Sequence, residues 1–257
     1  MAESGREFEG LLRLVARLRA EDGCPWDQEQ TPATIKRYLL EEVYEVVDAV
    51  EQHSADHVAE ELGDLIFMAI FLAQLYVEQG QFEIDQVLRR VANKMIGRHP
   101  HVFGDREVDS ARQVKLNWEE IKRQERPNKP LSAALKDIPR ALPALMRSHR
   151  ILSRLDRTFR RPLPRDFLRS QLQESFSALL DSDIGLERSQ SGAKLGKLLL
   201  LLAAFALPTE TGAEEALTQT LERFCQQVEG LEDSLREKGK DWGDLSEAEE
   251  RSLWENL

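Results

Sequence analysis

Cysteine is scarce in this chain, which holds only Cys24 and Cys225 among its 257 residues. Two cysteines so far apart in the sequence cannot build a disulfide framework or a structural zinc site. This cysteine usage is typical of a reducing compartment. We therefore expect the protein in the cytoplasm.

Long apolar runs are also missing. Residues 1–19 read as an amphipathic helix interrupted by charges, without the apolar centre of a signal peptide. The longest apolar stretch, residues 198–207, is too short to span a bilayer. We expect a soluble protein with no membrane partner.

Basic residues are outnumbered by acidic ones. The chain has 35 Lys and Arg against 46 Asp and Glu, which gives a formal net charge of −11. Binding to a nucleic acid polymer requires a basic surface, so we expect no such partner. A small anionic substrate is still compatible with this charge, because metal ions can neutralise it.

Strand patterns are absent as well, since no segment alternates apolar and polar residues between turn dipeptides. Apolar residues instead recur every three or four positions, which predicts helices. The predicted helices cover residues 8–19, 34–52, 56–79, 82–97 and 110–125. Thr34 and Asp56 are the expected N-caps of two of them. The sequence therefore predicts an all-α fold.

Acidic residues gather in two short segments of these helices. Glu41, Glu42 and Glu45 lie in the first segment, and Glu61 and Asp64 lie in the second. Glu42 and Glu45 are three residues apart, as are Glu61 and Asp64, so each pair shares a helix face. If the two helices pack together, four carboxylates converge, and Mg²⁺ prefers such oxygen ligands.

A solvated acidic face is the alternative interpretation, and Asp48 and Glu51 extend the first cluster as such a face would. The apolar run 65–73 argues for the metal site, because it directly follows Asp64. A helix that is apolar all round is expected to be buried. These carboxylates would then stand at the edge of a core, where a bound cation would offset their charge.

The second half of the chain resembles the first after a proline-containing connector at residues 126–144. Residues 40–45 align with 172–177, residues 61–66 with 194–199, and residues 118–120 with 254–256. An ordered set of matches favours a duplicated unit over a chance similarity of apolar helices.

The second copy has lost most of its carboxylates. Glu174 remains, while Gln173 and Ser177 replace two glutamates, and Lys194 and Lys197 stand where Glu61 and Asp64 stand in the first copy. A protonated lysine has no lone pair for a cation. We therefore assign metal chemistry to the first half alone.

Five motifs occur in order along the chain: GCPWDQEQT at 23–31, LLEEVYEVVDAV at 39–50, EELGDLIF at 60–67, RHPHVFGD at 98–105 and DIPRALPALMR at 137–147. Together they resemble the motifs of the MazG-type nucleoside triphosphate pyrophosphohydrolases. The resemblance covers the first half closely and the second half in layout only. It implies a two-repeat chain with a catalytic domain at 1–125, the connector at 126–144 and a degenerate helical domain at 145–257.

The resemblance also implies an activity and its residues. The implied reaction is Mg²⁺-dependent hydrolysis of a nucleoside triphosphate to the monophosphate and pyrophosphate, by a homodimer with helices of both chains around the site. The implied metal ligands are Glu42, Glu45, Glu61 and Asp64, with Glu41 as a further catalytic residue. The implied substrate-binding residues are Lys94, Arg98 and Trp118.

A non-enzymatic function is the alternative. An acidic helical dimer with one decayed repeat could be a regulatory or scaffold protein that binds a nucleotide without cleaving it. The intact first set of carboxylates favours the enzyme. The sequence does not identify the preferred base or sugar.

Overall fold

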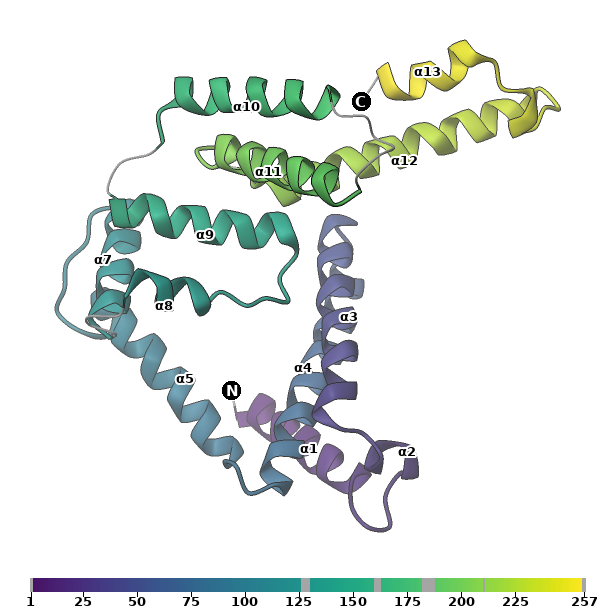
Figure 1. Ribbon diagram of the computed structural model, residues 1–257. Coiled ribbons are helices and arrows are strands. Elements are labelled where there is room, and N and C mark those ends of the chain that lie inside the picture. The colour runs from purple at the N-terminus through teal and green to yellow at the C-terminus, as the bar shows by residue number, and fades with distance from the viewer. Residues whose placement is uncertain (1, 126–129, 160–162, 182–187, 210, 256–257) are drawn as a thin grey trace. The chain divides into compact units, whose positions relative to one another are not determined.

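The computed structural model describes residues 2–125, 130–159, 163–181, 188–209 and 211–255 (Figure 1). These residues form α-helices and one short 3₁₀ helix, and no strand occurs in these ranges. The all-α prediction is confirmed. None of the described helices is long and apolar enough to cross a membrane.

The chain divides into two compact units, Met1–Arg126 and Pro127–Leu257. The helices of the first unit are α1 (Ala2–Leu18), α2 (Pro25–Gln28), α3 (Pro32–Glu51), α4 (Ala55–Glu78), α5 (Ile84–Arg98), α6 (Pro100–Phe103) and α7 (Ala111–Gln124). Those of the second are α8 (Leu131–Lys136), α9 (Ala144–Phe159), α10 (Arg165–Leu180), α11 (Arg188–Ala206), α12 (Ala213–Glu237), the 3₁₀ helix η1 (Trp242–Asp244) and α13 (Glu247–Glu255).

Helices α3 and α4 form an antiparallel hairpin that is the centre of the first unit (Figure 1). Thr31, not Thr34, is the N-cap of α3, because Pro32 fits the first helical position and Thr34 completes a capping box with Thr31. Ser54, not Asp56, caps α4 and accepts a hydrogen bond from the backbone N–H of His57. Both predicted N-caps are therefore wrong by two or three residues, although both predicted helices are confirmed.

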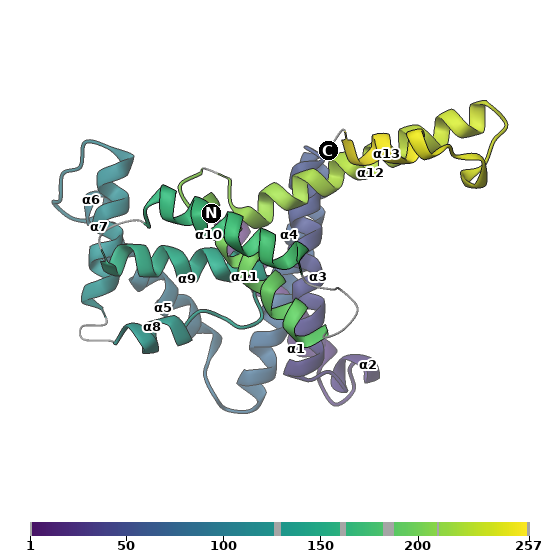
Figure 2. The same cartoon turned by 45° about the horizontal axis from the view of Figure 1, so that its top comes forward.

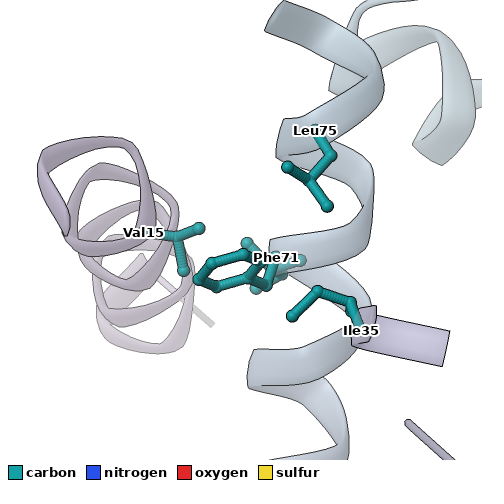
Figure 3. Close-up of a cluster of buried hydrophobic side chains, with 5 residues drawn as sticks. Val15, Ile35, Phe71 and Leu75 are labelled. Atoms are coloured by element: carbon teal, nitrogen blue, oxygen red, sulfur yellow. The ribbon is translucent and has the colours of Figure 1, made fainter. Parts of the chain in front are cut away.

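A small core lies where α1 crosses the hairpin. Val15 of α1, Ile35 near the start of α3, and Phe71 and Leu75 of α4 are buried together (Figure 3). Ile35 comes from the first turn of α3 and Leu75 from the last turns of α4, so this core occupies one end of the hairpin.

The other end of the hairpin keeps apolar side chains exposed. On α3 the exposed side chains follow the helical period at Leu40, Val43, Tyr44, Val47 and Val50. On α4, Leu62 and Ile66 are also exposed. The expectation of a fully buried helix is therefore wrong for Ile66 and Ala69, because no described residue of the first unit covers them.

Helix α5 follows a turn in which Gly80 has a φ of +65°, a conformation that suits glycine. Tyr76 of α4 stacks on Phe82 next to this turn, with ring centroids 5.7 Å apart. Helix α5 then runs away from the hairpin and contacts α6 and α7 (Figure 1).

The second unit is built around a second hairpin, formed by α10 and α11 and visible in both orientations (Figures 1 and 2). Helix α9 contacts α11, as α1 contacts α4 in the first unit. Part of the segment predicted as a connector forms the short helix α8, and a guanidinium nitrogen of Arg154 on α9 donates to the carbonyl oxygen of Ala134 on α8. Residues 126–129 of that connector lie outside the described residues.

Candidate functional site

Three carboxylates meet between α3 and α4. Glu42 and Glu45 come from α3 and Glu61 comes from α4, and oxygens of the three side chains lie within 4.8 Å of one another. Glu42 is seven residues beyond Ile35 on α3, so it lies about 10 Å along the helix from the core. The capped start of α4 brings Glu61 to the same level from the opposite direction.

The grouping of negative charge affects Glu42 most. Burial raises the pKa of Glu42, and the nearby carboxylates of Glu45, Asp64 and Glu61 raise this pKa further. A carboxylate in such surroundings is stabilised by a cation, which would replace the lost hydration and offset the repulsion.

Asp64 and Glu41 lie at the margin of this cluster. Asp64 is exposed and stands one turn beyond Glu61 on α4, and its charge is felt by Glu42. Glu41 is exposed on α3, and its oxygens are not among the three that meet. The structure thus brings three of the five predicted acidic residues into one group, with Asp64 near it.

His57 is a neighbour of the cluster that the sequence analysis did not connect with it. Its Nε2 lies 2.9 Å from Oε1 of Glu61, one helical turn further along α4. The separation of four residues was the available signal, since such pairs share a helix face. The imidazole fixes the direction of one carboxylate of the cluster.

The cluster fits a hard divalent cation. Its donors are all carboxylate oxygens, which are the ligands that Mg²⁺, Mn²⁺ and Ca²⁺ prefer. No histidine or cysteine belongs to the group within the described residues, which makes a zinc or copper site a poorer match. Glu42, Glu45 and Glu61 are the residues that would hold the ion. Asp64 lies near enough for its charge to act on Glu42.

Arg98 and Trp118 meet at a second location in the first unit. The guanidinium carbon of Arg98 lies 5.4 Å from the centroid of the Trp118 ring, and the ring of His99 meets Trp118 edge-on at 4.8 Å. Arg98 also forms an ion pair with Glu125, whose carboxylate lies 2.6 Å from Nη2. Trp118 is therefore half-buried under an arginine and a histidine.

Lys94 lies one turn before Arg98 on α5 and is exposed. It borders a shallow hollow on the surface of α5 together with Arg90 and Val91. The side-chain partners recorded for Arg98 are Glu125 and Trp118, not the carboxylates of α3 and α4. The predicted phosphate-binding residues and the predicted metal ligands thus form separate groups in the first unit.

The equivalent place in the second unit has the opposite charge. The Nζ of Lys194 on α11 donates to the carbonyl oxygen of Ala178 on α10, 3.1 Å away. Glu174 is exposed and accepts a hydrogen bond from Gln171 on its own helix. An ammonium group therefore bridges α10 and α11, the two helices whose sequences align with parts of α3 and α4.

Comparison with known proteins agrees with these observations. Residues 30–103, which contain the three converging carboxylates, match the family model described as the MazG nucleotide pyrophosphohydrolase domain. A solved structure, a MazG-related protein from Thermotoga maritima, aligns over 45% of this chain and 98% of its own length, with 27% identity and a TM-score of 0.40.

Relatives of nearly the same length exist in two bacteria. The nucleoside triphosphate pyrophosphohydrolase of Escherichia coli K12 is 34% identical over 98% of this chain and 97% of its own length. The nucleoside triphosphate pyrophosphohydrolase/pyrophosphatase MazG of Thermotoga maritima is 32% identical over 93% and 91%, respectively. Since the similarity extends through both units of the chain, this protein belongs to the MazG family.

Proposed function

We propose that the protein is a Mg²⁺-dependent nucleoside triphosphate pyrophosphohydrolase, which converts a nucleoside triphosphate and water to the monophosphate and pyrophosphate. The chemistry takes place in the predicted catalytic domain, residues 1–125, which lies within the first unit. The names of the relatives from Escherichia coli and Thermotoga maritima support the reaction. The observation that carries the proposal is the meeting of Glu42, Glu45 and Glu61 between two helices.

The acidic residues hold the metal in this proposal. Glu42, Glu45, Glu61 and Asp64 provide the oxygen ligands, and His57 orients Glu61 through the contact of Nε2 with its carboxylate. Held by these residues, Mg²⁺ would neutralise charge on the triphosphate and would lower the pKa of a water bound to it. Glu41 is exposed beside Glu42, where it can accept a proton from the attacking water.

The basic residues of α5 bind the phosphates. Lys94 and Arg98 are one turn apart, so their charges reach the same side of the helix. Arginine is suited to phosphate because its planar donors match two oxygens at once. Trp118 supports Arg98 from α7 and thereby takes part in substrate binding.

A homodimer accounts for two features of the first unit. The exposed apolar side chains of α3 form a continuous stripe beside the carboxylates, with Tyr44 58% and Val47 50% exposed. Large exposed apolar stripes favour association, because burial removes them from water. A second copy would also supply the basic residues that, within one chain, lie apart from the acidic cluster.

The second unit serves for packing and dimerisation and has no metal site in this proposal. Lys194 and Lys197 replace the two acidic residues of α4, and the Lys194 ammonium already bonds to α10. A cation would be repelled by these charges.

Product analysis by ³¹P NMR tests the proposal. The purified protein is incubated with Mg²⁺ and a panel of nucleoside and deoxynucleoside triphosphates. Monophosphate and pyrophosphate are the expected products. Diphosphate and orthophosphate would indicate a different phosphohydrolase. Absence of turnover, combined with a nucleotide-dependent rise in Tm, would indicate a nucleotide-binding regulator instead.

A further inference from the structure

The guanidinium of Arg98 is held on one face and along one edge. Its Nε lies 2.9 Å from Oε1 of Glu125 and its Nη2 lies 2.6 Å from Oε2, so the ion pair is bidentate. The ring of Trp118 lies against the guanidinium, 5.4 Å from Cζ to the ring centroid. The arginine side chain is only 14% exposed. The long, flexible side chain of Arg98 is thus held in place by Trp118 of α7 and by Glu125, which directly follows α7.

Arg19 has the same surroundings elsewhere in the first unit. Its Cζ lies 5.5 Å from the centroid of the Phe71 ring, and Glu78 accepts from Nε at 2.8 Å and from Nη2 at 2.6 Å. Nη1 of Arg19 donates to the carbonyl oxygen of Asp27, so this guanidinium has partners along both edges. Arg19, which directly follows α1, is thus tied to α2 by a hydrogen bond and to α4 by an ion pair.

Arg98 differs from Arg19 at one edge. In the part of the chain that the structure describes, Glu125 is the recorded hydrogen-bond acceptor for Arg98, and it takes only Nε and Nη2. A guanidinium has five N–H donors, so Nη1 and the second hydrogen of Nη2 remain for an acceptor. These donors point in parallel, which is the arrangement that binds two oxygens of a phosphate.

We propose that Glu125 is a positioning residue that holds Arg98, against the Trp118 ring, with its free edge directed to a phosphate of the substrate. This inference rests on the proposed function, because it takes a phosphate chain as the ligand of Arg98. The ordering of Arg98 occurs when the protein folds, so substrate binding does not have to fix that side chain. The role of Glu125 is thus to improve substrate binding through Arg98, not to contact the substrate.

The variant Glu125→Gln tests this role in the full-length protein. Glutamine keeps the shape but replaces one acceptor with a donor that faces Nη2. We measure kcat and KM with ATP and Mg²⁺, and the Kd of α,β-methylene-ATP by calorimetry. KM and Kd are expected to rise about tenfold, as for loss of a hydrogen bond to a charged group, with a much smaller change in kcat. Glu125→Asp keeps the charge and is expected to give a smaller rise.

Glu78→Gln is the matched control, because it breaks the equivalent ion pair of Arg19. It is expected to lower Tm and to leave KM and Kd unchanged. If Glu125→Gln lowers Tm without changing KM or Kd, the ion pair is structural and the inference is overturned. If the variant binds more tightly, Glu125 competes with phosphate, and the inference is overturned as well.

Arg98→Ala separates the failure of this inference from failure of the proposed function. Glu125→Gln is expected to have no further effect on KM or Kd in the Arg98→Ala background, because Glu125 acts through Arg98. An undiminished effect in that background would contradict the inference. If Arg98→Ala itself leaves KM and Kd unchanged, Arg98 does not bind phosphate, and that part of the proposed function fails together with the inference.

Discussion

Nε2 of His57 lies 2.9 Å from Oε1 of Glu61, so an imidazole contacts one of the three carboxylates that meet between α3 and α4. A group that orients a metal ligand typically changes metal affinity about 10–100-fold when it is removed. We expect His57→Ala to raise the Mg²⁺ concentration for half-maximal activity by about tenfold. A titration of activity with Mg²⁺ measures this concentration.

His57→Gln is the control for that substitution, because glutamine can still donate to Glu61. It is expected to raise the Mg²⁺ requirement less than alanine does. An unchanged requirement in His57→Ala would mean that the contact between His57 and Glu61 does not affect the metal site.

Neutralising the acidic residues of α4 tests the metal site directly. Glu61→Gln and Asp64→Asn keep the size of each side chain and remove a charged ligand. Both variants are expected to abolish turnover and the Mg²⁺-dependent rise in Tm, while the circular dichroism spectrum stays helical. Wild-type turnover in either variant would contradict the assignment of these ligands.

The raised pKa of Glu42 predicts how pH affects the metal-free protein. Burial and the neighbouring carboxylates favour the protonated form of this glutamate in the folded state. Its contribution to stability is fully present below the pKa of an unfolded glutamate, about 4.3, and is lost as pH rises through the folded pKa. Glu42→Gln, which stays neutral, is therefore expected to gain stability relative to the wild type as pH rises to 7.

Urea unfolding in EDTA at a series of pH values measures this difference. Added Mg²⁺ is expected to reduce or reverse it at pH 7, because the ion stabilises the ionised carboxylates of the wild type. A stability difference that does not change with pH would show that Glu42 is ionised as easily in the folded state as in the unfolded chain.

The acidic cluster could be predicted from the sequence because its information is local. Glu42 and Glu45 are one turn apart, and a short turn before α4 brings Glu61 back to them. The helices themselves follow from apolar periodicity. The N-caps were harder to predict. Thr31 and Thr34 both take part in one capping box, and only Pro32, at the first helical position, identifies Thr31 as the N-cap.

The pairing of Arg98 with Glu125 could not be predicted in this way. The two residues are 27 positions apart, Arg98 at the end of α5 and Glu125 directly after α7, and their meeting depends on how α5, α6 and α7 fold together. The exposure of Ile66 could not be predicted either, because an apolar run predicts burial but does not specify which other segment packs against it. Both cases concern tertiary packing, which periodicity does not specify.

The apolar stripe of α3 predicts the oligomeric state. Tyr44 and Val47 lie next to Glu45 and are exposed in the single chain. Tyr44→Asp places a charge in the stripe and is expected to convert the dimer to a monomer, since burying an unpaired charge is costly. Light scattering after size-exclusion chromatography measures the mass. Activity is expected to fall with the dimer, because in the proposed dimer each site takes basic residues from the second copy.

Leu14→Asp is a suitable control for that variant. Leu14 is 48% exposed on α1, close to the exposure of Val47, but it is not part of the α3 stripe. The control is expected to stay dimeric. A Tyr44→Asp protein that remains dimeric and active would mean that the stripe is not the contact between the copies.

A fragment of residues 1–126 tests the role of the second unit. The second unit exposes apolar side chains of its own, such as Phe176 and Leu199 on α10 and α11, which would add contact area in the proposed dimer. The fragment retains the core of Val15, Ile35 and Phe71, so it is expected to fold. Without the second unit its dimer is expected to be weaker, with activity per mass that falls on dilution. Sedimentation equilibrium and activity at several concentrations measure both effects.

A fragment that stays dimeric and fully active would contradict a dimerisation role of the second unit.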